Sequence, residues 1–219
     1  LEGLFLDAQT VPYLDLEMPW WNQSCRTELT IGNRLFFVTG DITQSMIDPM
    51  YVYAFNQKLA EDLGIEDPYT VVNEGRWTID YLRRQTADIS NDLNGDGKMD
   101  ENDFWGISTF QINAMDNYMQ STRVSLMSRD AEGMPVLDVD MERMTTLLEK
   151  VYGLCFENPG CRVGPGDQPG AAHTIFKEDR ALYTTLSMYD VRYSLAEMES
   201  DFGILPYPKL NEEQPVYGT

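Results

Sequence analysis

Apolar positions along the chain fall into short continuous runs separated by polar turns. Tyr51 to Phe55 is continuously apolar, as in a strand that is covered on both faces. The following NQKLAEDLG predicts a short helix that ends at Gly64. Further strands are predicted at 105–110, 181–186 and 202–205. Strands that alternate with helices predict an α/β domain.

Two longer helices are predicted from apolar residues spaced three and four apart. Thr78 suits the N-cap of the first helix, and Asp80 lies in its first turn. Its apolar face comprises Ile79, Leu82, Thr86 and Ile89. The second helix carries Met141, Met144, Leu148, Val151 and Cys155 on one face. We interpret these methionines as core packing rather than as sulfur ligands.

Other segments of the chain predict turns and loops. Residues 28–38 alternate as in a hairpin, with its turn at Gly32 and Asn33. The segment TGDITQSMIDP that follows is a candidate hinge, and GPGDQPG is expected to be a flexible loop.

The net charge of the chain limits the classes of partner that it is expected to bind. The 219 residues include 16 Lys+Arg and 36 Asp+Glu, a net charge of −20. This charge argues against nucleic acid and against docking on an anionic membrane. No apolar run reaches 18 residues, so no membrane-spanning helix is predicted. The ends lack obvious terminal signals, and we expect a processed or excised piece of a longer chain.

The cysteines and the single histidine restrict the chemistry. Cys25, Cys155 and Cys161 form no CxxC pair and have no zinc spacing. Cys155 and Cys161 flank the turn FENPG, which leaves open a small disulfide loop or two buried thiols. With His173 alone, a histidine-based metal site or a Ser-His-Asp triad is not expected.

The stretch DLNGDGKMDENDFWG follows the pattern of a calcium-binding EF-hand loop. Side chains at positions 1, 3, 5, 9 and 12 are Asp92, Asn94, Asp96, Asp100 and Asp103. Gly97 stands at the sharp turn, and Lys98 offers its carbonyl. Asp103 is shorter than the usual bidentate glutamate, so modest affinity is expected.

The flanks of this loop argue against a calcium sensor. A predicted helix precedes the loop but a predicted strand follows it, and the loop occurs once, whereas a sensor rotates two helices. A structural calcium ion (Ca2+) is one interpretation. A turn held by its own Asp and Asn side chains, without calcium, is the other.

Several segments together resemble the extracellular solute-binding proteins of bacterial ABC sugar importers, the family that includes maltose-binding protein. The segments are GRWTIDYLRRQTADISNDLNGDGKMDENDFWGIS, MPWWN with GNRLFFVTGD, YVYAFNQKLAEDLGIEDPY, IFKEDRALYTT and DFGILPYPKLNEEQPVYGT. Asp179 and Arg180 depart from the Gly-Lys that is usual in the fourth segment. Each motif is weak alone, but their order covers nearly the whole chain.

The resemblance implies a periplasmic-binding-protein-like type II lobe, with a mixed sheet flanked by helices. Residues 1–40 would be a remnant of the first lobe and 41–49 a hinge crossover. Residues 50–208 would form the second α/β lobe, including the loop 92–103, and 209–219 would return to the first lobe.

The resemblance also implies a non-enzymatic function. The protein would bind a sugar or oligosaccharide between two lobes and deliver it to ABC permease subunits. It would act as a monomer outside the cell, either periplasmic or anchored as a lipoprotein. A carbohydrate-active enzyme with an unidentified carboxylate pair, or a calcium-dependent interaction module, are the alternatives.

Aromatic rings that stack on sugar C–H faces and polar groups that bind hydroxyls define the candidate site. Tyr189 resembles a cleft position of the family, and so does Tyr118. Asp190 and Arg192, near Tyr189, are expected hydroxyl partners, with a surface ion pair as their alternative. Trp20 and Trp21 are a candidate stacking pair, although generic packing is their alternative. Asp41 and Gln44 at the presumed hinge complete the expected ligand-binding set, with backbone capping as their alternative.

Overall fold

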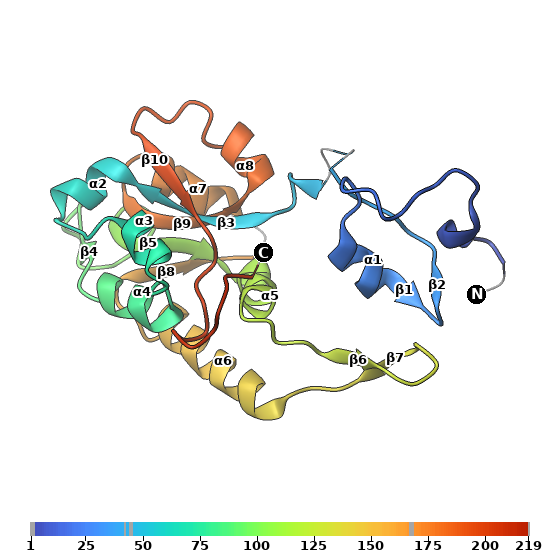
Figure 1. Cartoon of the computed structure of the whole chain (residues 1–219). Helices are drawn as coiled ribbons and strands as arrows, with labels where there is room; N and C mark the ends of the chain where they lie inside the picture. Colours follow the sequence, from blue (N-terminus) through green and yellow to red (C-terminus); the bar gives the residue numbers. More distant parts are fainter. Residues whose placement is uncertain (1–2, 42, 44–45, 167–168, 219) are drawn as a thin grey trace. The chain divides into compact units, whose positions relative to one another are not determined.

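The computed structural model describes residues 3–41, 43, 46–166 and 169–218 (Figure 1). The chain divides into two compact units. Unit 1 comprises residues 1–49 and 125–139, and unit 2 comprises residues 50–124 and 140–219. No helix among the described residues is long and apolar enough to cross a membrane.

Unit 2 is built around a mixed sheet with the order β10-β3-β9-β5-β4, and β8 also pairs with β5. Strand β5 is parallel to β8 and β9, whereas β3 is antiparallel to β9 and β10. The strands are β3 (Tyr51–Asn56), β4 (Ser90–Asn91), β5 (Phe104–Phe110), β8 (Cys161–Gly164), β9 (Ala181–Ser187) and β10 (Phe202–Leu205).

Helices cover both faces of this sheet, because successive residues of a strand point to opposite faces. Tyr53 and Phe55 join one core cluster with residues of α4, α5 and α6. Ala54 joins the other cluster, with residues of α7. The helices are α2 (Gln57–Asp62), α3 (Pro68–Asn73), α4 (Ile79–Thr86), α5 (Gln111–Ser121), α6 (Met141–Cys155), α7 (Pro169–Lys177) and α8 (Met188–Tyr193). The predicted α/β class is confirmed.

The sequence signals at α4 act as expected. The Thr78 hydroxyl caps the helix by accepting a hydrogen bond from the Tyr81 N–H at 3.2 Å. The preceding Trp77 is fully buried and donates its indole N–H to the Pro206 carbonyl at 2.9 Å. The WT pair thus fixes the start of α4 within the core.

The face of α6 differs from the prediction. The helix bounds match the predicted repeat, but Met141 and Leu148 are exposed. The buried residues are Leu147, Val151, Gly153, Leu154 and Cys155. The buried face is therefore rotated from the predicted one, because Leu147 and Leu154 lie one residue away from the methionine repeat.

Unit 1 consists of short elements. They are the 3-10 helix η1 (Ala8–Thr10), α1 (Gln23–Leu29), β1 (Thr30–Ile31), β2 (Arg34–Leu35), β6 (Met127–Arg129) and β7 (Pro135–Leu137). Gly32 and Asn33 both have positive φ in the turn between β1 and β2, as a tight hairpin requires. The predicted hairpin is confirmed, although its strands are only two residues long.

A second hairpin, β6–β7, was not expected in unit 1. It follows α5 along the chain, yet the Gly133 carbonyl accepts a hydrogen bond from the Gly32 N–H at 3.1 Å. Arg129 donates to the Thr27 carbonyl at 3.2 Å. Turn-to-turn contacts therefore place 125–139 with the first 49 residues.

The last residues of the chain pack on unit 2. Lys209 and Leu210 are buried, and the backbones of Lys209 and Thr78 form an isolated parallel β-bridge. The Gly218 N–H donates to the Ser121 carbonyl at 3.2 Å. The return crossover at 209–219 remains a prediction.

Asp179 stands at the position where the family that the sequence resembles usually has glycine. Its φ is +56°, a conformation that favours glycine. Its carboxylate accepts hydrogen bonds from Asn56 Nδ2 at 2.5 Å and from Ser200 Oγ at 2.7 Å. These bonds support an aspartate where the resemblance expects glycine.

Candidate functional site

Several strand ends of unit 2 meet at one edge of the sheet. Strand β9 ends at Ser187, which pairs with Tyr51 at the start of β3. Strand β5 ends at Phe110, which pairs with Gly164 at the end of β8. Since β5, β8 and β9 run parallel, their carboxyl ends share this edge. Ligands of open α/β sheets bind outside the carboxyl ends of the strands. We call this end of the sheet, where Phe110, Gly164 and Ser187 lie, the ligand edge.

Helix α8 begins at this edge, directly after β9. Ser187 caps it by accepting from the Asp190 N–H at 3.2 Å, and Asp190 accepts from the Ser187 N–H at 3.1 Å and from its hydroxyl at 2.6 Å. This reciprocal capping box fixes the entry into a helix of only six residues. The structure therefore gives Asp190 a capping role, and its contact with ligand hydroxyls remains a prediction.

The exposed face of α8 carries an aromatic pair. Tyr189 and Tyr193 are 51% and 57% exposed, and their ring centroids lie 4.4 Å apart. The Arg192 guanidinium lies 5.2 Å from the Tyr193 ring centroid and donates to the Tyr193 hydroxyl at 3.3 Å. Tyr189, Arg192 and Tyr193 form what we call the α8 platform. Tyr193 was not predicted as a site residue, although its spacing of four from Tyr189 indicates a shared helix face.

A buried polar layer lies beneath the α8 platform. His173 is 4% exposed; its Nε2 lies 3.3 Å from the Thr185 carbonyl, and its Nδ1 lies 3.9 Å from Asp190. Burial lowers the pKa of His173 below its ordinary value, and the nearby Asp190 carboxylate opposes this shift. The Thr109 and Thr185 hydroxyls are 2.6 Å apart. This layer connects α8 to the ends of β5 and β9.

Tyr118 does not lie at a surface. It is 1% exposed within α5, and its hydroxyl contacts the Tyr53 hydroxyl. Burial raises the pKa of Tyr118 well above its ordinary value. Its ring meets Tyr207 edge-on, with the centroids 5.2 Å apart. The expectation of a cleft position is therefore corrected: Tyr118 is a core residue with no free face for stacking.

Trp20 and Trp21 both belong to unit 1, but only Trp21 packs on a core. Trp20 is 41% exposed, whereas Trp21 packs on a small core and donates its indole N–H to the Asp15 carbonyl at 2.9 Å. The Asp41 N–H donates to the Trp20 carbonyl at 2.8 Å, and the Asp41 side chain is exposed. Gln44 lies outside the described residues. As ligand-binding residues, these four remain predictions.

The acidic loop 92–103 folds as a chain of side-chain-to-backbone hydrogen bonds. Asp92 accepts from the Gly95 and Gly97 N–H groups at 2.6 and 2.9 Å. Asp103, which is fully buried, accepts from the Leu93 and Asp100 N–H groups at 2.9 and 2.8 Å. The side chains of Asn94, Asp96 and Asp100 each accept from the N–H two residues ahead.

This arrangement matches the self-bonded turn, in which the loop's own N–H groups donate to its side-chain oxygens. Among the described residues, no group of three or more His, Cys, Asp or Glu side chains could hold a metal ion. Arg180 donates to the Glu101 carbonyl, and the Trp105 indole N–H donates to the Asp100 carbonyl at 2.8 Å. The loop is thereby anchored to the sheet, and calcium binding by Lys98 and its neighbours remains a prediction.

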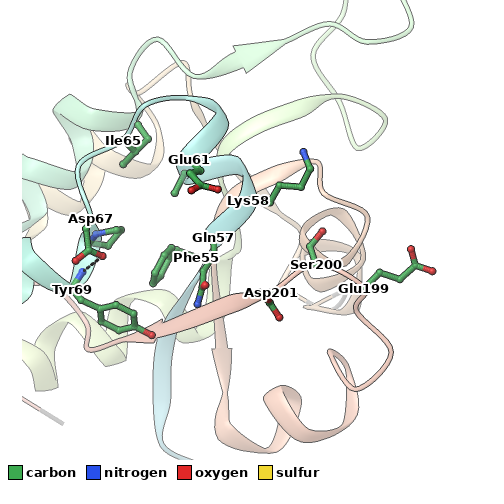
Figure 2. A pocket seen from close by; sticks show the side chains of 12 residues that line it. Phe55, Gln57, Lys58, Glu61, Ile65, Asp67, Tyr69, Glu199, Ser200 and Asp201 are labelled. Atoms are coloured by element: carbon green, nitrogen blue, oxygen red, sulfur yellow. Dashed lines mark hydrogen bonds between the residues drawn. The ribbon is translucent and has the colours of Figure 1, made fainter.

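A cavity of about 600 Å³ lies at the opposite edge of the sheet (Figure 2). Phe55 and Tyr69 line it, their rings edge to face with centroids 5.3 Å apart. Its other lining residues include Lys58, Glu61, Asp67, Glu199 and Asp201. This is the end of β3 where Asn56 pairs with Phe202, away from α8, and it contains none of the predicted site residues. The ligand edge, not this cavity, matches the rule for open α/β sheets.

The mixed sheet, covered by helices on both faces, has the periplasmic-binding-protein-like fold. UspC of Mycobacterium tuberculosis is similar to this chain at a TM-score of 0.59 and 13% identity, over 94% of this chain and 50% of UspC. The Thermus thermophilus maltotriose-binding protein, bound with maltotriose, matches at 0.50 and 14%, over 87% and 44%. A cyclo/maltodextrin-binding protein complexed with maltotetraose matches at 0.50 and 14%, over 87% and 43%.

These similarities show the fold and its extent. The chain spans about half the length of each of these three structures. The two maltodextrin structures are of binding proteins rather than enzymes. No protein-family model and no curated protein sequence matches the chain.

Proposed function

We propose that this chain supplies about one lobe of a two-lobed solute-binding protein that captures a sugar or a related polyhydroxylated solute. The α8 platform carries the proposal. Two exposed tyrosine rings and a guanidinium project from a helix that is locked by its capping box at the ligand edge. Such rings stack on the apolar C–H faces of a sugar, and a guanidinium donates several hydrogen bonds to hydroxyls.

The platform is an open surface, and this limits what the lobe does alone. Ligand pockets bury most of the surface of their ligand, which one open face does not. In the proposed protein, a second lobe closes over the bound solute in a hinge motion. We therefore expect weak binding by this chain and much tighter binding by a longer protein that contains both lobes.

The wider biological role extends this proposal. The closed form would be recognised by the permease subunits of an ABC importer, with the protein acting as a monomer on the extracellular or periplasmic side. A lipid anchor and a structural calcium ion in the loop 92–103 belong to the same proposal. The fold shared with the maltotriose- and maltodextrin-binding proteins supports the choice of a binding protein over a carbohydrate-active enzyme.

A titration with malto-oligosaccharides tests the proposal. Tyr189→Ala is expected to lower the affinity of the two-lobed protein about two- to tenfold through the lost stacking alone, because an aromatic contact contributes about 0.5–1.5 kcal/mol beyond its buried area. Tyr152→Ala is the matched control: Tyr152 is 57% exposed, close to the 51% of Tyr189, and pairs with Phe156, but it lies on α6. Equal effects of the two substitutions would contradict the assignment, and turnover of the sugar would favour an enzyme.

A further inference from the structure

Two buried cysteines lie on either side of a short turn in unit 2. Cys155 is the last residue of α6 and Cys161 is the first residue of β8, with the five residues FENPG between them. They are 7% and 8% exposed and belong to the same core cluster. Both are free thiols in the structure, and within this cluster they lie close enough for Cys155 to raise the pKa of Cys161.

The turn between them is held in place by its own contacts. Asn158 is buried; its carbonyl accepts from the Cys161 N–H at 3.0 Å, and its side chain accepts from the Gly160 N–H at 3.0 Å. Asn158 Nδ2 donates to the Thr86 hydroxyl at 2.9 Å. A Cβ at Gly160 would lie 1.7 Å from the Thr86 carbonyl oxygen, so only glycine allows this close approach. The fold thus fixes both cysteine positions independently of any bond between them.

We propose that Cys155 and Cys161 are joined by a disulfide bond that staples the end of α6 to the start of β8. A disulfide-containing small molecule, such as oxidised glutathione, is the oxidant. One cysteine thiolate attacks the oxidant and releases one glutathione thiol, and the second cysteine displaces the other glutathione from the mixed disulfide. One S–S bond forms and one breaks. Two electrons pass to glutathione, and the two cysteine protons end on its thiols.

The environment of the thiols sets when this bond forms. The nearby Cys155 and the burial both raise the pKa of the Cys161 thiol well above its ordinary value. Because the thiolate is the reacting form, the folded, reduced protein is expected to oxidise slowly. The bond therefore forms during folding, while the turn is accessible. An oxidising compartment outside the cytosol is required, and this requirement rests on the proposed extracellular or periplasmic function.

The test counts thiols in the full 219-residue chain. The reduced, denatured protein is refolded in a mixture of reduced and oxidised glutathione, then denatured and alkylated without reduction. We expect the free thiols to fall from three to one, with an unreduced digest linking the peptides of Cys155 and Cys161. The closed loop of seven residues predicts a melting temperature roughly 5–10 °C above that of the reduced protein.

Cys25→Ser provides the control, since Cys25 lies in unit 1 and is half-buried. This variant is expected to go from two free thiols to none. Cys155→Ser is expected to form no internal bond. Three free thiols after refolding, or a bond that includes Cys25, would overturn the proposal. Because the readout is a thiol count, its failure leaves the sugar proposal standing, and a failure to bind sugar leaves the disulfide standing.

Discussion

Removal of the Asp190 carboxylate tests how the α8 platform is held. In Asp190→Ala, the Ser187 N–H and hydroxyl lose the acceptor that now lies 3.1 and 2.6 Å away. Hydrogen bonds to a charged group contribute about 1.5–3 kcal/mol when buried, but the Asp190 side chain is 24% exposed and water replaces part of the loss. A lost cap costs about 1 kcal/mol. We therefore expect the free energy of unfolding to fall by about 1–2 kcal/mol.

The local effect should exceed the global one, because a helix of six residues is marginal by itself and the substitution removes half of its capping box. Hydrogen exchange followed by mass spectrometry is expected to show faster exchange across 188–194, with the sheet unchanged. Glu197→Ala is the control, since Glu197 is 88% exposed and forms a surface ion pair with Lys177 at 3.3 Å. Wild-type exchange in the Asp190→Ala helix, or an equal effect of Glu197→Ala, would refute the reasoning.

Three further predictions concern the loop, the strained aspartate and the histidine. Calcium is expected to raise the melting temperature relative to EDTA, and Asp92→Ala to abolish this gain; an unchanged transition at millimolar calcium would leave the self-bonded turn as the explanation. Asp179→Ala is expected to lower the free energy of unfolding, measured in urea, by about 2 kcal/mol, because the variant loses two hydrogen bonds and keeps the positive φ. Asp179→Gly is expected to cost less, because glycine adopts this φ without strain. The opposite order of the two variants would contradict this account. The lowered pKa of His173 means that the unfolded chain takes up its proton first as the pH falls, so the stability that the neutral ring contributes is present above about pH 6.5 and is lost below it. Melting temperatures at pH 7.5 and 5.5 should therefore differ more for the wild type than for His173→Gln, and equal differences would count against the buried neutral histidine.

Elements with strong local signals could be predicted from the sequence. The apolar run of β3, the cap at Thr78 and the bounds of α6 are confirmed, whereas the buried face of α6 is not the predicted one. Helix α5 was missed because Phe110 supplies no side-chain cap, so no start signal marks it. Tyr118 was expected in the cleft from the resemblance alone, and α5 instead places it in the core.

The site was only partly within reach of the sequence. Tyr189 and Arg192 were predicted through the resemblance and remain predictions as ligand contacts. The capping box of Ser187 and Asp190 is a local signal for α8 that the sequence analysis did not use. The position of His173 depends on the packing of α7 against β5 and β9, which no local pattern encodes. The placement of the β6–β7 hairpin in unit 1 likewise depends on contacts between turns about one hundred residues apart.

The most direct test of the central claim is an NMR titration of this chain with a panel of saccharides that includes maltotriose and maltotetraose. The account predicts weak, saturable shifts in the amide signals of 188–193 and at the neighbouring ends of β5 and β9. It also predicts that Tyr189→Ala removes these shifts while the rest of the spectrum stays folded. Shifts centred on the cavity around Phe55 and Tyr69, or no response of α8 to any saccharide in the panel, would contradict the claim that the α8 platform is the sugar-binding surface.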